Sequence, residues 1–326
     1  MAHIEEAVDP IAYAVRTGLE ARHKTLPPWL FYDERGSHLF EQITTLPEYY
    51  LTRTERALLE VHADEILSLM GREVTIVELG AGTATKTGVV LRAAQRMQER
   101  LLYQPIDISP SALSQARTEI EAHIPGVSVH SQVANYITDP YRIDREPDRS
   151  VLALYIGSSI GNFSPEEARG ILANLRRHIR PGDALLLGTD LAPSAKKSVE
   201  ALLAAYDDAL GVTAAFNCNI LTRLNRDLSA NFAADGFRHQ ARWNAAESRI
   251  EMHLESLARQ TVLLPANSSG PDLKLQLAKG ETIHTENSYK FTAETIEAML
   301  MPSGFTTLRT FQDPDHLFAV TLASAT

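Results

Sequence analysis

Residues 76–87, Ile-Val-Glu-Leu-Gly-Ala-Gly-Thr-Ala-Thr-Lys-Thr, combine an acid, two glycines and a lysine that could bind a nucleotide-like ligand. Glycines let the backbone approach a bound group closely. A dinucleotide-binding loop prefers G-x-G-x-x-G, and a phosphate-binding loop prefers G-x-x-x-x-G-K-[ST]. In both patterns Thr85 stands where the last glycine belongs, although Lys86 and Thr87 keep the end of the second pattern. The stretch therefore matches neither nucleotide motif in full.

The segment from Glu78 to Gly82 resembles the E-x-G-x-G cofactor loop of S-adenosylmethionine-dependent methyltransferases. Apolar, β-branched residues lead into it from Val74, and a helical pattern begins at Thr87, so we expect a strand, a tight loop and a helix start. We favour this interpretation over the two nucleotide motifs. A strand-to-helix turn that binds no ligand is the structural alternative.

An acid follows the second predicted strand. Residues 101–107 have a strand pattern that ends at Asp107, and Ser109 is a plausible cap for the next helix. Asp107 comes 27 residues after Gly80, near the spacing at which an acid can bind the hydroxyls of a cofactor ribose. A carboxylate there would repel phosphate, which favours a nucleoside ligand. The alternative role of Asp107 is that of an ordinary acid at a helix N-terminus.

The composition is that of a globular protein with a small-molecule substrate. The chain has 326 residues, 44% of them hydrophobic and 22% charged. Its net charge of -10 argues against nucleic-acid binding, which needs a basic face. The single cysteine, Cys218, excludes an intramolecular disulfide framework and a cysteine-based zinc cluster. The sequence has no signal-peptide pattern and no run of ~18 apolar residues, so we expect a cytoplasmic protein without membrane contact. We also expect a monomer.

Strand and helix patterns alternate from about residue 55 to residue 193. This alternation predicts an α/β fold with a doubly wound, parallel, Rossmann-like sheet. Ligands of such sheets bind at the carboxyl ends of the strands. Four polar or glycine positions fall at those ends: Gly80, Asp107, Gly157 and Asp190.

The alternation stops after residue 193. Residues 211–238 mix short helical pieces with asparagine-rich turns, and strand patterns follow to residue 289. A last helix and two strands would then complete the first sheet. We therefore expect a methyltransferase domain of residues 55–193 and 290–326, and a second, α+β substrate domain of residues 1–54 and 194–289.

Segments spread over the chain resemble one enzyme family. The resemblance runs from about residue 24 to the C-terminus, and its motifs keep their order across both expected domains. They closely resemble the histidine Nα-methyltransferases of ergothioneine biosynthesis, and the segments are Leu26–Asp33, Leu46–Glu55, Glu78–Thr83, Tyr155–Phe163, Leu187–Asp190, Ala205–Asp208, Gly211–Asn217, Arg249–Met252 and Thr285–Phe291. The resemblance implies three methyl transfers from S-adenosylmethionine to the α-amino nitrogen of L-histidine, giving hercynine, without a metal.

The resemblance also implies which residues bind the cofactor. Gly80, Lys86 and Asp107 would hold it, and Asn135 and Tyr136 would contact its adenine. The family usually has an aspartate in the adenine segment. Asn135 can still accept a hydrogen bond from the adenine amino group but carries no charge, so cofactor affinity is in question at this position.

For the substrate, the resemblance implies seven residues. Asn162 and Tyr206 would bind the carboxylate of histidine, and Tyr32 and the Gly157 backbone would lie near its amine. The imidazole would contact Tyr49, Glu286 and Ser288. Residues two apart on an extended segment face the same way, so the carboxylate and the hydroxyl of the last pair could meet both imidazole nitrogens.

Three other interpretations remain open. The same fold could methylate another amino acid such as tryptophan, although an indole would favour an apolar pocket over Glu286 and Ser288. A P-loop-like ATPase is supported by Lys86-Thr87 and by Asp190 after an apolar strand, but Thr85 weighs against it. A non-catalytic regulator that binds S-adenosylmethionine would share these sequence features.

Overall fold

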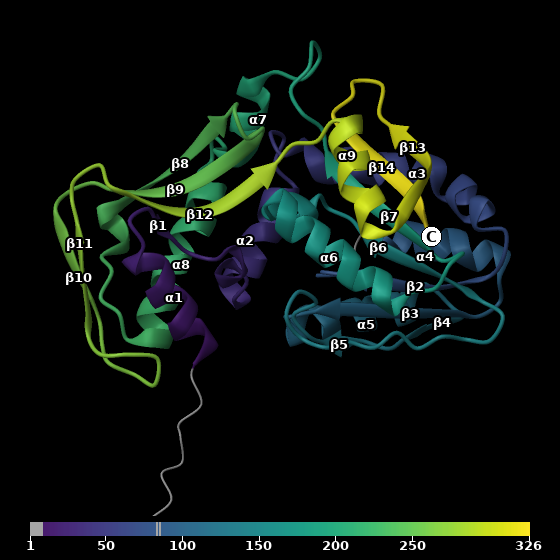
Figure 1. Ribbon diagram of the computed structural model, residues 1–326, viewed down its shortest axis with the longest axis horizontal. Coiled ribbons are helices and arrows are strands. Elements are labelled where there is room, and N and C mark those ends of the chain that lie inside the picture. The colour runs from purple at the N-terminus through teal and green to yellow at the C-terminus, as the bar shows by residue number, and fades with distance from the viewer. Residues whose placement is uncertain (1–8, 83, 85) are drawn as a thin grey trace, which may run out of the picture. The chain divides into compact units, whose positions relative to one another are not determined.

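The computed structural model describes residues 9–82, 84 and 86–326, so Thr83 and Thr85 of the glycine loop lie outside the described residues (Figure 1). The chain divides into two compact units. Unit 1 is Met1–Tyr49 with Val199–Ser288, and unit 2 is Tyr50–Ser198 with Tyr289–Thr326. The sequence placed the crossings after residues 54, 193 and 289, whereas the units exchange chain after residues 49, 198 and 288.

Unit 2 contains the doubly wound sheet that the alternating pattern predicts. The strand order is β13-β14-β7-β6-β2-β3-β4, and β5 also pairs with β3. The pairs from β7 through β6, β2 and β3 to β4 are parallel, whereas β14 runs antiparallel to both β7 and β13. The strands are β2 Val74–Leu79, β3 Leu101–Asp107, β4 Val127–Val129, β5 Gln132–Val133, β6 Ser150–Tyr155, β7 Ala184–Asp190, β13 Phe305–Gln312 and β14 Phe318–Ala325.

Helices α5, α6 and α9 of unit 2 each follow a residue whose side chain accepts from one of their free N–H groups. Ser109 and Ser164 accept from the backbone of α5 and α6, and Thr292 accepts from α9. Ser164 and Thr292 each form a reciprocal capping box. The helices are α3 Tyr50–Met70, α4 Thr87–Met97, α5 Pro110–His123, α6 Pro165–His178 and α9 Ala293–Leu300, with 3-10 turns at η2 Ser159–Asn162 and η4 Met301–Ser303.

Alternation along the strands gives the sheet two packed faces. Val77, Val151 and Leu185 share one face, because successive strand residues point to opposite sides. They form a buried cluster with α6 and α9, which lie together in Figure 1. Helices α3 and α4 pack against each other, and α3 also contacts β7 and β14. With both faces covered, the carboxyl edge of the strands remains for a ligand.

Unit 1 is α+β, as expected. Its four-stranded sheet has the order β1-β12-β9-β8, and β10 and β11 form a separate antiparallel pair. The strands are β1 Lys24–Thr25, β8 Phe237–Asn244, β9 Arg249–Ser256, β10 Gln260–Leu264, β11 Leu273–Leu277 and β12 Thr282–Tyr289. The helices are α1 Pro10–Glu20, α2 Glu34–Thr44, α7 Val199–Tyr206 and α8 Val212–Leu228, with 3-10 turns at η1 Pro28–Phe31 and η3 Ala234–Gly236.

The sequence predicts short helical pieces and asparagine-rich turns for residues 211–238, and this prediction is wrong for the first part of the segment. Residues Val212–Leu228 form one continuous helix, α8. Asn217 and Asn219 are buried inside this continuous helix. Their amides donate to His239 at 2.8 Å and to Asp33 at 2.8 Å. These partners remove the competition with the backbone that makes asparagine a turn former in sequence.

The aromatic residues that precede the glycine loop are mostly packing residues of unit 1. Phe31 stacks on Phe216 of α8 with ring centroids 4.6 Å apart, and Tyr32 meets the edge of Phe216 at 6.0 Å. Both rings are thus packed on α8. Among the described residues no helix is long and apolar enough to cross a membrane.

Candidate functional site

The glycine loop at the end of β2 uses the backbone freedom of its two glycines. Gly80 and Gly82 have φ of 68° and 51°, in the left-handed region. The Gly80 N–H donates to the Ile106 carbonyl at 2.9 Å, which ties the loop to β3. A Cβ on Gly80 would lie 3.4 Å from the ring of Tyr136. The loop therefore passes closely between β3 and an aromatic side chain.

Asp107 lies at the carboxyl end of β3, as predicted. Its Oδ2 accepts the Gly82 N–H at 2.9 Å, and its Oδ1 accepts the Ser109 N–H at 2.9 Å. These two bonds fix the plane of the half-buried carboxylate. Each oxygen keeps a further lone pair, so the group can still accept a ligand hydroxyl.

The adenine candidates Asn135 and Tyr136 follow β5. Asn135 Oδ1 accepts the Ile137 N–H at 3.1 Å, so part of its acceptor capacity stabilises the local turn. The Tyr136 hydroxyl lies 3.2 Å from the hydroxyl of Tyr155 on β6. Burial raises the pKa of Tyr136 to about 12, and the phenol therefore stays protonated. Tyr136 and Gly80 are neighbours, whereas the side chain of Asn135 serves the turn.

Lys86 is held by an acid that the sequence interpretation did not select. Its Nζ forms an ion pair with Oε2 of Glu55, a fully buried residue of α3. The other oxygen, Oε1, accepts the Gly157 N–H at 2.7 Å. Glu55 thus joins two predicted site residues that come from different strand ends. A signal was present, because Glu55 stands in an apolar stripe with Leu58 and Leu59.

Gly157 begins the turn that carries Asn162. Gly157 and Ser158 have φ of 83° and 57°, and η2 follows them. A Cβ on Gly157 would lie 3.0 Å from Lys86 Nζ. A Cβ on Gly161 would lie 2.9 Å from the Tyr289 carbonyl. The turn is therefore packed tightly on both sides, which fixes the position of Asn162.

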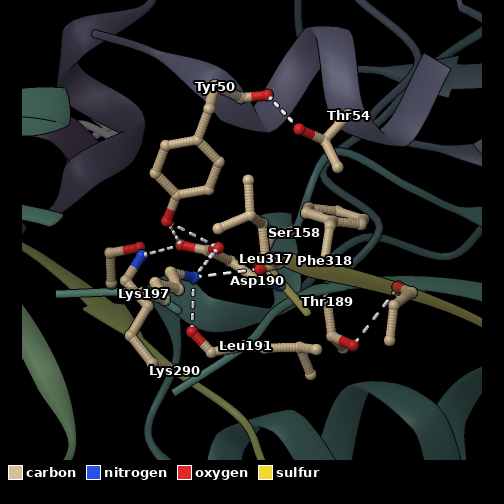
Figure 2. Close-up of polar contacts among 12 residues, drawn as sticks. Tyr50, Thr54, Ser158, Thr189, Asp190, Leu191, Lys197, Lys290, Leu317 and Phe318 are labelled. Atoms are coloured by element: carbon tan, nitrogen blue, oxygen red, sulfur yellow. Dashed lines mark hydrogen bonds and ion pairs between the residues drawn. The ribbon is translucent and has the colours of Figure 1, made fainter. Parts of the chain in front are cut away.

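Asp190, at the end of β7, is completely buried and surrounded by donors (Figure 2). Lys290 Nζ lies 2.7 Å from one oxygen, and Lys197 Nζ lies 2.5 Å from the other. The Tyr50 hydroxyl reaches both oxygens at 2.9 and 3.1 Å. Because protein donors occupy this carboxylate, it does not resemble the metal-binding acid of a P-loop ATPase.

In unit 1, three of the predicted substrate residues lie together. The Tyr206 hydroxyl, at the end of α7, is 2.7 Å from Ser288 Oγ on β12. The ring of Tyr49 meets the ring of Tyr206 edge-on, with centroids 6.2 Å apart. The resemblance had assigned Tyr206 and Ser288 to opposite ends of histidine, yet their hydroxyls are in direct contact.

The remaining substrate candidates of unit 1 are Glu286 and Tyr32. Glu286 lies on β12, two residues before Ser288, and its backbone carbonyl accepts from His284 Nε2 at 3.0 Å. The extended segment predicted here is therefore a strand within the four-stranded sheet. Tyr32 ends η1, where its ring packs on Phe40 at 5.8 Å.

One group of metal-ligand types occurs among the described residues of unit 1: Glu251, His253 and His284, with ligand atoms within 4.8 Å of one another. The two histidine rings stack at 4.7 Å with 20° between their planes. Lone pairs of imidazole lie in the ring plane, so nearly parallel rings cannot both point at one ion. Arg249 also lies 2.7 Å from the Glu251 carboxylate. The group is an ion-paired cluster in this conformation.

The similarity of this chain to known proteins extends over nearly its whole length. The family model for histidine-specific, S-adenosylmethionine-dependent methyltransferases matches residues 11–325. A histidine N-alpha-methyltransferase of Mycolicibacterium smegmatis is 40% identical over 319 residues, covering 98% of this chain and 96% of that protein. The enzyme of the same name from Mycobacterium tuberculosis is 41% identical over 310 residues, covering 95% of this chain and 93% of that protein.

A more distant relative is ergothioneine biosynthesis protein 1 of Neurospora crassa, 30% identical over 215 residues, covering 65% of this chain and 24% of that protein. With the match extending over both units, the chain belongs to the family of histidine-specific, S-adenosylmethionine-dependent methyltransferases.

Proposed function

We propose that this protein methylates the α-amino nitrogen of L-histidine three times and so forms hercynine, the betaine that ergothioneine biosynthesis requires. The observation that carries the proposal is the near full-length similarity to two histidine N-alpha-methyltransferases. The E-x-G-x-G loop with its fixed acid, Asp107, supports the cofactor side of the reaction.

On the cofactor side, the residues present fit a nucleoside. Gly80 lies against the ring of Tyr136, and a Cβ at position 80 would already be in van der Waals contact with that ring. Asp107 has two oxygens oriented by backbone N–H groups and able to accept ribose hydroxyls. Lys86, paired with Glu55, would lie by a carboxylate or other polar group of the ligand. S-adenosylmethionine supplies an electrophilic methyl group when bound.

On the substrate side, we propose that Glu286 and Ser288 bind the imidazole with Tyr49. Tyr206 and Asn162 would bind the carboxylate. Buried polar partners left unpaired cost ~1–3 kcal/mol each, so an amino acid with an apolar side chain should bind poorly. This argument disfavours tryptophan as the substrate.

The methyl group passes directly from the sulfonium to the amine, so the protein needs to form no covalent bond with either reactant. Alignment of the amine with the methyl group can contribute up to ~7–11 kcal/mol through proximity. The amine must lose its proton before it attacks, and we propose that Tyr32 and the Gly157 backbone hold it in place. No metal is needed for such a displacement, and we propose a metal-free reaction by a cytoplasmic monomer.

Mass spectrometry tests the reaction directly. Purified protein is incubated with S-adenosylmethionine and an equimolar mixture of the common amino acids. We expect histidine to gain three methyl groups while the other amino acids stay unchanged. Methylation of tryptophan instead would contradict the imidazole-binding assignment but keep the reaction class. Cofactor binding without methylation of any amino acid would favour the regulator interpretation.

Glu286→Ala tests the substrate assignment. We expect the KM for histidine to rise about 10- to 100-fold, because a charged hydrogen-bond partner is lost. The Kd of S-adenosylmethionine should stay within twofold. Glu255→Ala is the matched control, since Glu255 lies on β9 of the same sheet and pairs with Arg238 at 2.7 Å. Equal weakening of both ligands by Glu286→Ala would refute the assignment.

A further inference from the structure

The chain passes between the two units at three places, and at each place a residue of unit 2 bonds the carboxylate of Asp190. Unit 2 takes over from unit 1 at Tyr50, and Tyr50 bonds the Asp190 carboxylate. The chain returns to unit 1 after Ser198, and Lys197, the residue before Ser198, bonds the same carboxylate. The chain enters unit 2 again at Tyr289, and Lys290 completes the set. Figure 2 shows these side chains converging on one carboxylate.

The charged groups of this network are buried. The side chains of Asp190, Lys197 and Lys290 are all 0% exposed. Lys197 Nζ also donates to the carbonyls of Leu191 and Leu317 at 2.5 and 3.0 Å, so its three protons all have acceptors. Breaking a buried, fully paired charge network is costly, and its geometry is correspondingly well defined.

The backbone around Asp190 reinforces the same anchor. The Asp190 N–H donates to Ser158 Oγ at 2.9 Å, and the Phe291 N–H donates to the Asp190 carbonyl at 2.9 Å. The Ala192 N–H in turn donates to the Phe291 carbonyl at 2.8 Å. The segment that precedes the second crossing and the segment that follows the third crossing are therefore hydrogen-bonded to each other through their backbones.

Each crossing continues directly into a segment with proposed histidine-binding residues. Tyr49 immediately precedes Tyr50, and Ser288 lies two residues before Lys290. Lys197 lies two residues before the start of α7, and that helix ends at Tyr206. Each of these segments is joined through the backbone to a residue that bonds Asp190. The point at which each segment leaves unit 2 therefore depends on Asp190.

We propose that Asp190 is a positioning residue for histidine: through Tyr50, Lys197 and Lys290, its carboxylate fixes the three segments that carry the substrate-binding residues. The proposal rests on the function proposed above. Asp190 itself is fully buried and its oxygens are occupied, so it acts through these partners and not by touching the substrate. Histidine recognition should depend on it, whereas cofactor binding by the glycine loop should not.

Kinetics of Tyr50→Phe, Lys197→Met and Lys290→Met test the proposal. Tyr50→Phe is the mildest change, because it removes one hydroxyl and keeps the ring. We expect each variant to raise the KM for histidine at least tenfold. The Kd of S-adenosylmethionine, measured by calorimetry, should stay within twofold of the wild type.

Arg145→Met is the matched control. Arg145 pairs with Asp183, a buried carboxylate just before β7, as Lys290 pairs with Asp190 at the other end of that strand. Both changes remove a cation from a buried aspartate, and both should lower Tm. Only the change at Asp190 should raise the KM for histidine.

The outcomes separate the two proposals. Unchanged histidine KM in all three variants, in a wild type that methylates histidine, would refute the positioning role alone. The same refutation follows if Arg145→Met raises the KM equally, or if cofactor and histidine weaken together. A wild type that does not methylate histidine would overturn the proposed function and this inference with it.

Discussion

Asp190 and Glu78 are two carboxyl groups buried in the same sheet, and their surroundings are opposite. Burial alone raises the pKa of Asp190, but the charges of Lys290 and Lys197 outweigh it, and the pKa is lowered. Glu78 receives hydrogen bonds from the hydroxyls of Thr87, at 2.8 Å, and Tyr103. Among the described residues no cation is bonded to Glu78, and burial raises its pKa to about 7.

The comparison shows that burial does not decide the charge of these acids; their bonded partners do. Asp190 remains a carboxylate and holds two ammonium groups. Glu78, the acid of the E-x-G-x-G loop, links the start of α4 to β3 through neutral hydroxyls. Its role in the described structure is thus to shape the loop, and it is half protonated near neutral pH.

The largest effect should come from removing the paired acid. Asp190→Leu leaves two buried ammonium groups without a counter-charge, and we expect it to lower the free energy of unfolding by about 3–5 kcal/mol. Urea denaturation at pH 7 measures this. A loss below about 1 kcal/mol would contradict this expectation and would show that the carbonyls of Leu191 and Leu317 can hold Lys197 without the carboxylate.

An intermediate, pH-dependent effect should follow from Glu78→Gln. Because the folded pKa is raised from 4.5 to about 7, the folded state binds the proton more tightly than the unfolded state does. The wild type should therefore lose stability as pH rises from about 4.5 to 7 and lose no more above that. Glutamine keeps an acceptor for both hydroxyls and cannot ionise.

The difference in Tm between Glu78→Gln and the wild type, followed from pH 4 to pH 8, measures this effect. The variant should gain relative to the wild type across that window, by at most about 3 kcal/mol. A Tm difference that does not change with pH would mean that Glu78 does not titrate there. Urea denaturation of both proteins at pH 8 checks the size of the gain.

The smallest effect should come from an exposed acid. Asp64 on α3 pairs with Arg96 on α4, and the side chains are 69% and 59% exposed. Asp64→Ala should change the free energy of unfolding by no more than about 0.5 kcal/mol, because solvent screens exposed pairs. A loss comparable to that of Asp190→Leu would contradict the expectation that exposed ion pairs stabilise the fold less than buried ones do. Urea denaturation under the same conditions allows direct comparison.

The sequence located the residues that stand at strand ends. Gly80, Asp107 and Gly157 could be placed because a doubly wound sheet brings the carboxyl ends of its strands to one edge. Alternating strands and helices also predicted the parallel part of that sheet. These inferences needed only local patterns and a general topological rule.

Contacts between distant segments could not be predicted in this way. Glu55 meets Lys86 and Gly157 only because α3 packs on the sheet. Its place in an apolar stripe of α3 indicates burial but does not identify these two partners. The contact between Tyr206 and Ser288 joins residues far apart in sequence. Helix α8 was missed for the same reason, since its asparagines depend on partners from other elements.

The packing of Glu55 also limits which residue can stand at position 188, which has no proposed contact with either ligand. A Cβ on Gly188, in the middle of β7, would lie 2.0 Å from Glu55 Oε1. Even alanine there would displace the acid from Lys86 and from the Gly157 N–H. In a mutational scan, Gly188 should therefore be as intolerant as a ligand-binding residue, although its own side chain is a single hydrogen atom.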